Sequence, residues 1–256
     1  MTDENTGSLG DLPIPDLRHL HSLGLPRHPR LDAMHFHNDP KSRVPRAAPC
    51  LNDSYYVLCE ARYALIEGFN QVRKYRANEP PDEWHAAFFG QFYGADVALR
   101  LYAAGEHLAN AIVEMLGIDR SALKNCRSDS RSSLQAILAK FLASNFPRHP
   151  IFAAVRKLGE SKDWQQSMNY RNDWVHEQAP QVRGLGIQFK RDEEYWREGR
   201  DSGGTWHEIG FGGQGRPDLP VDDLLEFVGR AACAFTEALT AIAANYKEQV
   251  LAHPPK

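Results

Sequence analysis

Two long helical patterns between residues 53 and 117 constrain the fold of this chain more than any other feature. The first begins behind an Asp53-Ser54 cap and repeats apolar residues at helical spacings, namely Tyr55, Leu58, Tyr63, Ile66 and Phe69. The sequence EPPDEW interrupts it, Asp82 starts a second pattern, and Gly117 ends that pattern as a helix-terminating residue. Two consecutive amphipathic helices with a short connection predict a helical hairpin.

The rest of the chain adds further helical patterns. We expect helices over residues 132–146, 151–158, 162–178 and 220–251. The last has an apolar stripe made of Leu224, Phe227, Val228, Ala231, Phe235, Leu239 and Ile242. Pro147 and Pro180 favour helix boundaries at the residues before them. The predicted fold class is therefore an all-α bundle.

Two segments lie outside the helical pattern. Residues 1–50 contain seven prolines and five histidines without periodicity, which is typical of a leader that drapes over the main body or is partly loose. Residues 181–219 hold two strand-like stretches, 186–199 and 205–213, joined through RDSGG. We therefore expect a Pro/His-rich leader (1–50), a helical bundle (51–180), a loop or β-hairpin insertion (181–219) and a C-terminal helix packing on the bundle (220–250).

The composition is that of a folded, water-soluble chain. It is 42% hydrophobic and 25% charged, with a formal net charge of -3, which argues against coating nucleic acid by bulk electrostatics. The charge is uneven, because residues 120–176 hold ten Lys or Arg against four Asp or Glu. This excess of positive charge is compatible with solvated helix faces or with a surface for a polyanion.

Several function classes receive no support from the sequence. The amino end has no basic start followed by an apolar run, and no eighteen apolar residues follow one another, so we expect a cytoplasmic protein without a membrane span. Four scattered cysteines indicate neither a disulfide scaffold nor a zinc site. His35 and His37 lack further ligands for a metal, and the glycine-rich stretch 210–215 lacks the lysine of a phosphate loop.

An arginine, an amide, a carboxylate and a histidine are packed into the six residues RNDWVH, from Arg171 to His176, just before Ala179-Pro180. On a helical wheel Arg171 falls on the same side as Trp164, Met168 and Val175, which we interpret as the apolar stripe. Asn172 and His176 fall beside it.

An arginine on an apolar stripe needs a partner, because its guanidinium stays charged at any ordinary pH. One interpretation is a structural salt bridge to Glu106 on the second helix, with His176 as a helix-end histidine. The other is an anion site, in which Arg171 holds a phosphate and His176 moves a proton. His107 and Asn110, near Glu106 in the stretch GEHLAN, are possible additional residues lining such a site.

The motif Arg171-Asn172-Asp173-Trp174-Val175-His176 resembles the signature of the HEPN superfamily, an arginine and a polar residue followed by a histidine near the end of a helix. The resemblance covers residues 53–178, and the last helix would complete the bundle. Many catalytic HEPN proteins are metal-independent endoribonucleases of toxin-antitoxin, phage-defence and RNA-processing systems. They are α-bundles that dimerise so that two motifs form one cleft.

This resemblance implies a cytoplasmic endoribonuclease that works without a cofactor or metal. The 2′-hydroxyl of RNA would be the nucleophile, His176 would transfer a proton, Arg171 would stabilise the phosphorane oxygens, and Asn172 would position the phosphate or the imidazole. The implied partners are RNA, a second copy of the chain, and an antitoxin or nucleotidyltransferase. The alternative is a non-catalytic HEPN-fold module that binds a nucleotide or another protein.

Overall fold

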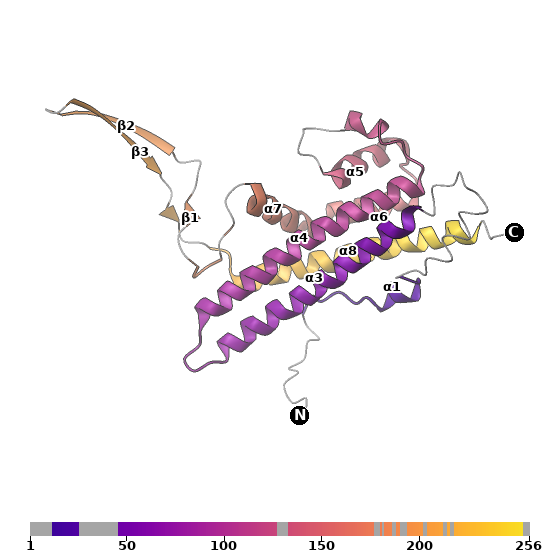
Figure 1. Cartoon of the computed structure of the whole chain (residues 1–256), viewed down its shortest axis with the longest axis horizontal. Helices are drawn as coiled ribbons and strands as arrows, with labels where there is room; N and C mark the ends of the chain where they lie inside the picture. Colours follow the sequence, from indigo (N-terminus) through magenta and orange to yellow (C-terminus); the bar gives the residue numbers. More distant parts are fainter. Residues whose placement is uncertain are drawn as a thin grey trace.

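Three long helices run side by side through the molecule in the computed structural model (Figure 1). The structure describes residues 12–25, 46–126, 133–176, 180, 182–185, 188–189, 194–201, 204–211, 214–215 and 218–252. The long helices are α3 (Ala47–Arg76), α4 (Glu83–Met115) and α8 (Val221–Leu251). The predicted all-α class is confirmed.

The helices α3 and α4 form the hairpin that the sequence predicts. Asp82 caps α4 by accepting a hydrogen bond from the backbone N–H of His85 at 3.1 Å. Gly117 follows the end of α4 with φ of 61°, a conformation that glycine adopts without steric cost. Both predicted boundaries of the second helix are therefore confirmed.

The first long helix differs from the prediction at its start and on one face. It begins at Ala47 rather than behind Asp53, because Ala47, Ala48 and Leu51 are buried and extend its apolar side. Pro49 is compatible with this start, since proline is tolerated in the first turn of a helix. Tyr63, one of the apolar residues of the predicted amphipathic pattern, is 66% exposed and lies outside the buried face.

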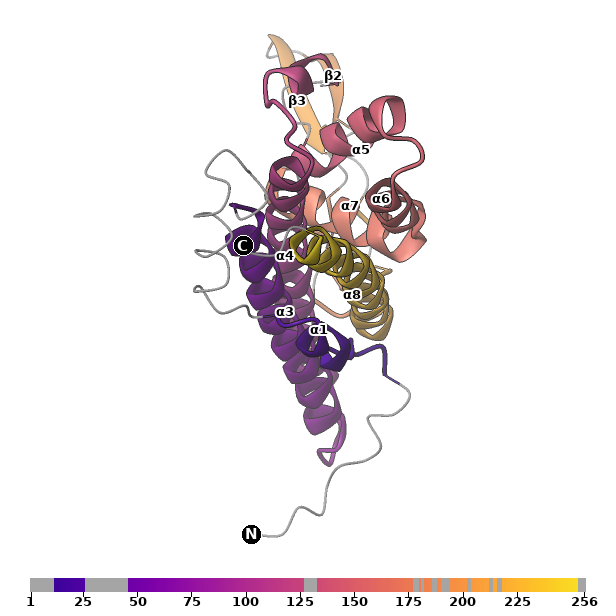
Figure 2. The same cartoon turned by 90° about the vertical axis from the view of Figure 1, so that its right-hand side faces the viewer.

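The shorter helices pack on one side of the long ones (Figure 2). They are η3 (Ala122–Cys126), α5 (Leu134–Asn145), α6 (Pro150–Glu160) and α7 (Lys162–His176). Ser133 caps α5 and His149 caps α6, each accepting a hydrogen bond from a backbone N–H in the first turn.

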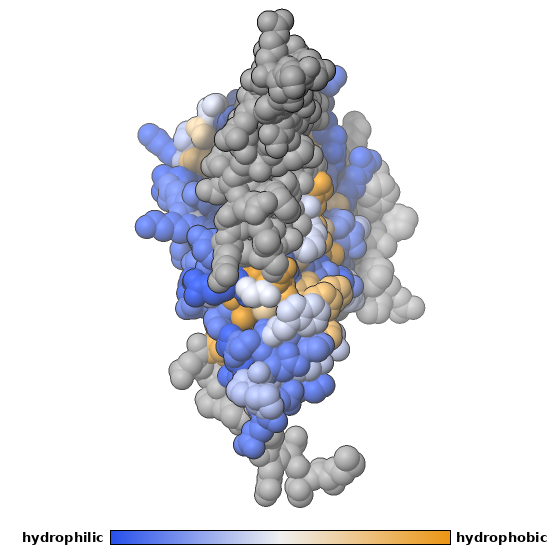
Figure 3. All heavy atoms as spheres, turned by 90° about the vertical axis from the view of Figure 1, so that its left-hand side faces the viewer, coloured by the Kyte–Doolittle hydropathy of each residue, from blue (hydrophilic) through white to orange (hydrophobic). Residues whose placement is uncertain are grey.

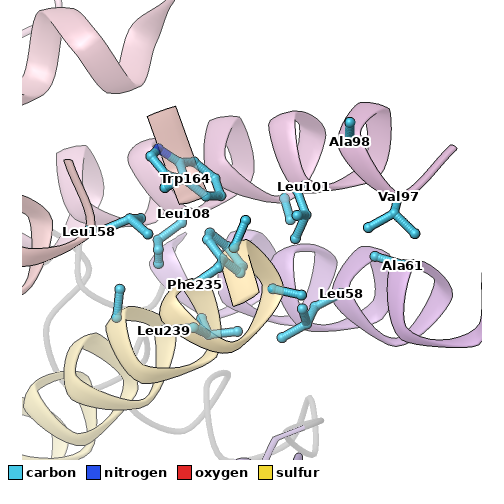
Figure 4. Close-up of a cluster of buried hydrophobic side chains, with 14 of the residues drawn as sticks. Leu58, Ala61, Val97, Ala98, Leu101, Leu108, Leu158, Trp164, Phe235 and Leu239 are labelled. Carbon is cyan, nitrogen blue, oxygen red and sulfur yellow. The ribbon is translucent and has the colours of Figure 1, made fainter. Parts of the chain in front are cut away.

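The core lies where α3, α4, α7 and α8 meet, and Figure 4 shows part of it. The ring of Trp164 on α7 stacks on Phe235 of α8 with centroids 5.5 Å apart, and Leu101 and Leu108 of α4 are buried in the same cluster. All seven residues of the predicted stripe on α8 are buried. Among the described helices only α8 is long and apolar enough to cross a membrane, but 61% of its apolar window is buried inside the molecule, as in a core helix.

Part of the N-terminal segment packs on the helices. It contains the short helix α1 (Arg18–Ser22), and Leu20 and Leu25 are buried. The carbonyl of Pro15 accepts a hydrogen bond from Arg62 Nε at 3.1 Å. Residues 12–25 therefore cover α3 and α8, whereas residues 1–11 and 26–45 lie outside the described part.

Strands occur between α7 and α8. They are β1 (Gln188–Phe189), β2 (Glu194–Asp201), β3 (Gly204–Phe211) and β4 (Gln214–Gly215). The pairs β2–β3 and β1–β4 are antiparallel. The interpretation of this segment as an insertion into a HEPN fold stays a prediction.

Candidate functional site

The guanidinium of Arg171 lies over an aromatic ring at the seam between α7 and α4. Its Cζ is 3.8 Å from the ring centroid of Tyr102, within the range of a cation–π contact. Arg171 Nη1 also donates a hydrogen bond to Oδ1 of Asn172 at 3.1 Å. The structure therefore joins two residues of the predicted site, Arg171 and Asn172, and fixes the arginine against α4.

The buried face of α7 is rotated relative to the predicted stripe. Trp164, Ser167 and Tyr170 are buried, whereas Val175, which the wheel assigned to the stripe, is 45% exposed. The reason is aromatic packing: Tyr170 stacks on Trp174 and meets the edge of Phe227 on α8, which turns this side of α7 inward. Arg171 consequently lies half-buried at the border of the buried face rather than at its centre.

The carboxylate of Glu106 binds the start of α5, whereas one interpretation of the sequence was a salt bridge from Glu106 to Arg171. Its two oxygens accept hydrogen bonds from the backbone N–H groups of Leu134 and Gln135, each at 3.3 Å, at the start of α5. A negative charge at this position stabilises a helix N-terminus. Glu106 thus anchors α5, while Tyr102, one turn earlier on α4, contacts Arg171.

Tyr102 is the residue that the sequence interpretation missed. The sequence signal for Tyr102 is its position one turn before Glu106, because residues i and i+4 share a helix face. Burial raises the pKa of the Tyr102 hydroxyl, the charge of Glu106 raises it further, and the cation of Arg171 opposes both effects. The phenol therefore stays protonated at neutral pH.

His107 and Asn110 make their described contacts elsewhere. His107 Nδ1 lies 3.9 Å from the carboxylate of Asp53 on α3, and Asn110 Oδ1 accepts a hydrogen bond from Arg120 at 2.6 Å. His107 comes five residues after Tyr102, which places it about 140° around α4 at about 100° per residue. The structure shows no contact that would join these two residues to Arg171 within the described part of the chain.

His176 is the last residue of α7, and its side chain lies outside the described part. On the helix backbone it follows Asn172 by four residues, so both lie on the same side of α7, one turn apart. Asn172 is exposed. This arrangement puts Asn172 between Arg171, to which it is hydrogen-bonded, and the position of His176.

The positive charge between residues 120 and 176 is partly neutralised. Lys157 pairs with Glu237 at 2.8 Å, and Arg156 lies 3.7 Å from Glu160. Lys140 and Arg148, on α5 and just after it, are exposed. Lys140 and Arg148 are therefore two exposed cations on the side of the molecule where the shorter helices lie.

Metal ligands are not gathered in the described residues: no group of three or more His, Cys, Asp or Glu side chains is placed to hold a metal ion there. His28, His35 and His37 lie outside this part. The four cysteines are half-buried and free. Burial raises the pKa of the thiols of Cys50 and Cys233, which disfavours the reactive thiolate.

The fold and the site define a helical protein in which an arginine of α7 is held over the ring of Tyr102 on α4. Comparisons with protein-family models, with curated proteins and with solved structures give no match.

Proposed function

We propose that this chain is a metal-independent endoribonuclease of HEPN type. The observation that carries the proposal is the Arg171–Tyr102 contact, with Asn172 hydrogen-bonded to the same guanidinium. An aromatic ring orients the plane of a guanidinium that lies over its face. A cation held in this way suits the binding of a phosphate.

Each residue of the site has a separate role in the proposed RNA cleavage. Arg171 stabilises the charge that develops on the phosphorane oxygens, and His176 accepts the proton of the attacking 2′-hydroxyl or protonates the leaving 5′-oxygen. Asn172 positions the phosphate or the imidazole. The 2′-oxygen forms a bond to phosphorus as the bond to the 5′-oxygen breaks, so the product carries a 2′,3′-cyclic phosphate.

The proposed partners follow from this activity. RNA is the substrate, and the exposed Lys140 on α5 and Arg148 between α5 and α6 supply positive charge that a polyanion would gain from. A second copy of the chain would bring two motifs together. A role as a toxin or phage-defence effector, controlled by an antitoxin or nucleotidyltransferase, belongs to the same proposal.

An RNA cleavage assay in EDTA tests the proposed function. Wild type is expected to cleave single-stranded RNA and to leave cyclic phosphate ends, and His176→Ala is expected to lose cleavage while keeping its far-ultraviolet circular dichroism spectrum. His19→Ala, at an exposed histidine on α1, is the matched control and should cleave like wild type. An inactive wild type, or cleavage that requires a divalent ion, contradicts the proposal.

A non-catalytic module for binding another protein or a nucleotide is the second candidate. One observation favours the protein-binding form: Trp84, Phe88 and Phe92 are large apolar side chains on α4, each between 43% and 59% exposed. Exposed aromatic residues are enriched at protein interfaces.

A further inference from the structure

A strongly basic segment of the chain covers η3, α5 and all but the last residue of α6. Residues 120–159 hold eight Lys or Arg and one Asp, a net charge of +7, although the formal net charge of the whole chain is -3. We call residues 120–159 the basic segment. Its described residues, 120–126 and 133–159, contain six Lys or Arg and no Asp or Glu. The positive charge of the molecule is therefore concentrated on one set of short helices.

Acidic residues of neighbouring elements neutralise only part of this charge. Lys157 pairs with Glu237 of α8 at 2.8 Å, and Arg156 lies 3.7 Å from Glu160. The carboxylate of Glu106 on α4 accepts hydrogen bonds from the first backbone N–H groups of α5. These three carboxylates therefore act on the start of α5 and on two cations of α6.

Three other cations of the basic segment remain available to a ligand. Lys124 on η3, Lys140 on α5 and Arg148 between α5 and α6 are exposed, and none of them forms an ion pair with a described residue. Asp119, just before the segment, accepts a hydrogen bond from the backbone N–H of Ser121 at 2.9 Å. The three exposed side chains thus present positive charge to the solvent.

The basic segment begins to pack on α4 next to the candidate site. The side-chain amide of Gln135, in the first turn of α5, donates a hydrogen bond to the backbone carbonyl of Tyr102 at 3.2 Å. The guanidinium of Arg171 lies over the ring of the same Tyr102. Lys140 follows Gln135 by five residues, which is about 8 Å along the helix. A polyanion with one phosphate at Arg171 can therefore extend along α5 to further cations.

The character of this surface favours a nucleic acid over a membrane or another protein. The large hydrophobic side chains that are exposed in the described part lie on α3, α4 and α7, and none lies on η3, α5 or α6. Figure 3, in which the shorter helices lie toward the left, shows a mostly hydrophilic described surface on that side. A helix on a membrane buries an apolar face, and the centre of a protein interface is rich in aromatic residues and poor in lysine. Binding to phosphates needs positive charge and no apolar burial.

We propose that Lys124, Lys140 and Arg148 bind the phosphate backbone of a single-stranded RNA beside the nucleotides at the candidate site. The binding is independent of sequence, because contacts to phosphates carry no base information. Its role in RNA cleavage rests on the proposed function, whereas the binding of a single strand rests on the charge and exposure of the three residues. These residues supply affinity and take no part in the proposed chemistry.

Salt-dependent binding of an oligonucleotide tests the proposal. The probe is fluorescein-labelled oligodeoxythymidylate, which has no 2′-hydroxyl and is not cleaved by the proposed reaction. Each contact between a cation and a phosphate contributes about 0.7 to the slope of log K against log salt for a single strand. The triple variant Lys124→Ala, Lys140→Ala, Arg148→Ala is expected to make this slope shallower by about 2 and to weaken binding roughly 100-fold at about 0.1 M salt. Circular dichroism checks that it is folded.

The matched control removes three exposed cations on the other side of the molecule. Arg18→Ala, Arg73→Ala, Lys74→Ala changes α1 and the end of α3, which lie away from α5 in Figures 1 and 2. The control loses the same charge, but salt screens exposed charges beyond about 10 Å at 0.1 M. Its affinity and its salt dependence should therefore equal those of wild type.

Each outcome of the binding experiment decides for or against this surface. A wild type that does not bind the oligonucleotide, or a triple variant with wild-type affinity and salt dependence, overturns the proposal. An equal loss in the control variant also overturns it, because the attraction is then one of bulk charge. Binding to vesicles of phosphatidylserine in place of the oligonucleotide would show a membrane surface instead.

RNA cleavage by the same variants decides the proposed function separately. With a long oligouridylate the triple variant is expected to raise KM and to keep kcat, as when uniform substrate binding is lost, and it should cleave the dinucleotide UpU like wild type. A protein that binds through the three cations without cleaving RNA supports the surface and contradicts the ribonuclease. Cleavage of long RNA with the same KM in wild type and triple variant supports the ribonuclease and contradicts the surface.

Discussion

At the scale of single residues, the contact that matters most is the one between Arg171 and the ring of Tyr102. It replaces the salt bridge to Glu106 that the sequence left open, since Glu106 binds the first backbone N–H groups of α5. The two arrangements differ in energy. A cation–π contact contributes about 0.5 to 2 kcal/mol, whereas breaking a buried ion pair costs about 3 to 5 kcal/mol.

Arg171→Ala is therefore expected to lower the free energy of unfolding by only about 1 kcal/mol and to abolish RNA cleavage. Arg171→Lys keeps a charge but not the planar guanidinium, so it should retain stability and recover little activity. Urea unfolding and the RNA assay measure the two effects. A stability loss of more than about 3 kcal/mol, with cleavage per folded molecule retained, would show that the arginine is structural.

At the scale of elements, α8 approaches the hairpin of α3 and α4 closely because glycines face it. A Cβ atom on Gly90 of α4 would lie 2.9 Å from Val72 Cγ2 and closer still to Val221 Cγ2, and one on Gly94 would lie 2.8 Å from Leu224 Cγ. No such atom can be accommodated without a shift of the neighbours. The glycines thus set the distance between α4 and α8 in the first half of α4, where Trp84, Phe88 and Phe92 are exposed.

Gly90→Ala is expected to destabilise the protein by about 1 to 3 kcal/mol through overpacking, a cost that exceeds the gain in helix propensity of up to about 1 kcal/mol. Gly159→Ala in α6 is the matched control, because a Cβ there has nothing within 4 Å. That variant should be neutral or more stable by up to about 1 kcal/mol. Thermal melts compare the two; equal melting temperatures would contradict this account of the packing.

The helices could be predicted from the sequence because their signals are local. The cap at Asp82, the stop at Gly117 and the stripe on α8 are all present in the structure. The buried face of α7 could not be predicted in this way. Tyr170 and Trp174 turn this face toward Phe227, a residue far away in the sequence. The Arg171–Asn172 hydrogen bond joins two neighbouring residues of the motif, whereas the contact between Arg171 and Tyr102 joins two helices that are far apart in the sequence. The sequence makes Tyr102 a candidate by its spacing from Glu106 but does not show that Arg171 packs on it.

At the scale of the whole molecule, residues 12–25 belong to the folded body, although they come before any long helical pattern. The side chain of Leu20 is fully buried, and the hydroxyl of Tyr55 on α3 lies 2.8 Å from Nε2 of His21. A Cβ atom on Gly229 of α8 would lie 2.6 Å from the carbonyl oxygen of Pro13, so this segment packs tightly on α8. Its contribution to stability should therefore equal that of a core element.

Leu20→Ala tests this integration. Removing a fully buried leucine side chain costs about 2 to 5 kcal/mol, through lost burial and the cavity left behind. We expect such a loss in one cooperative urea transition, followed by circular dichroism, because residues 12–25 contact both α3 and α8 and should unfold with them. His19→Ala, one residue away and exposed, should change stability by no more than about 0.5 kcal/mol. If Leu20→Ala unfolds like His19→Ala, residues 12–25 add nothing to the stability of the bundle, and the N-terminal segment is an appendage rather than part of the core.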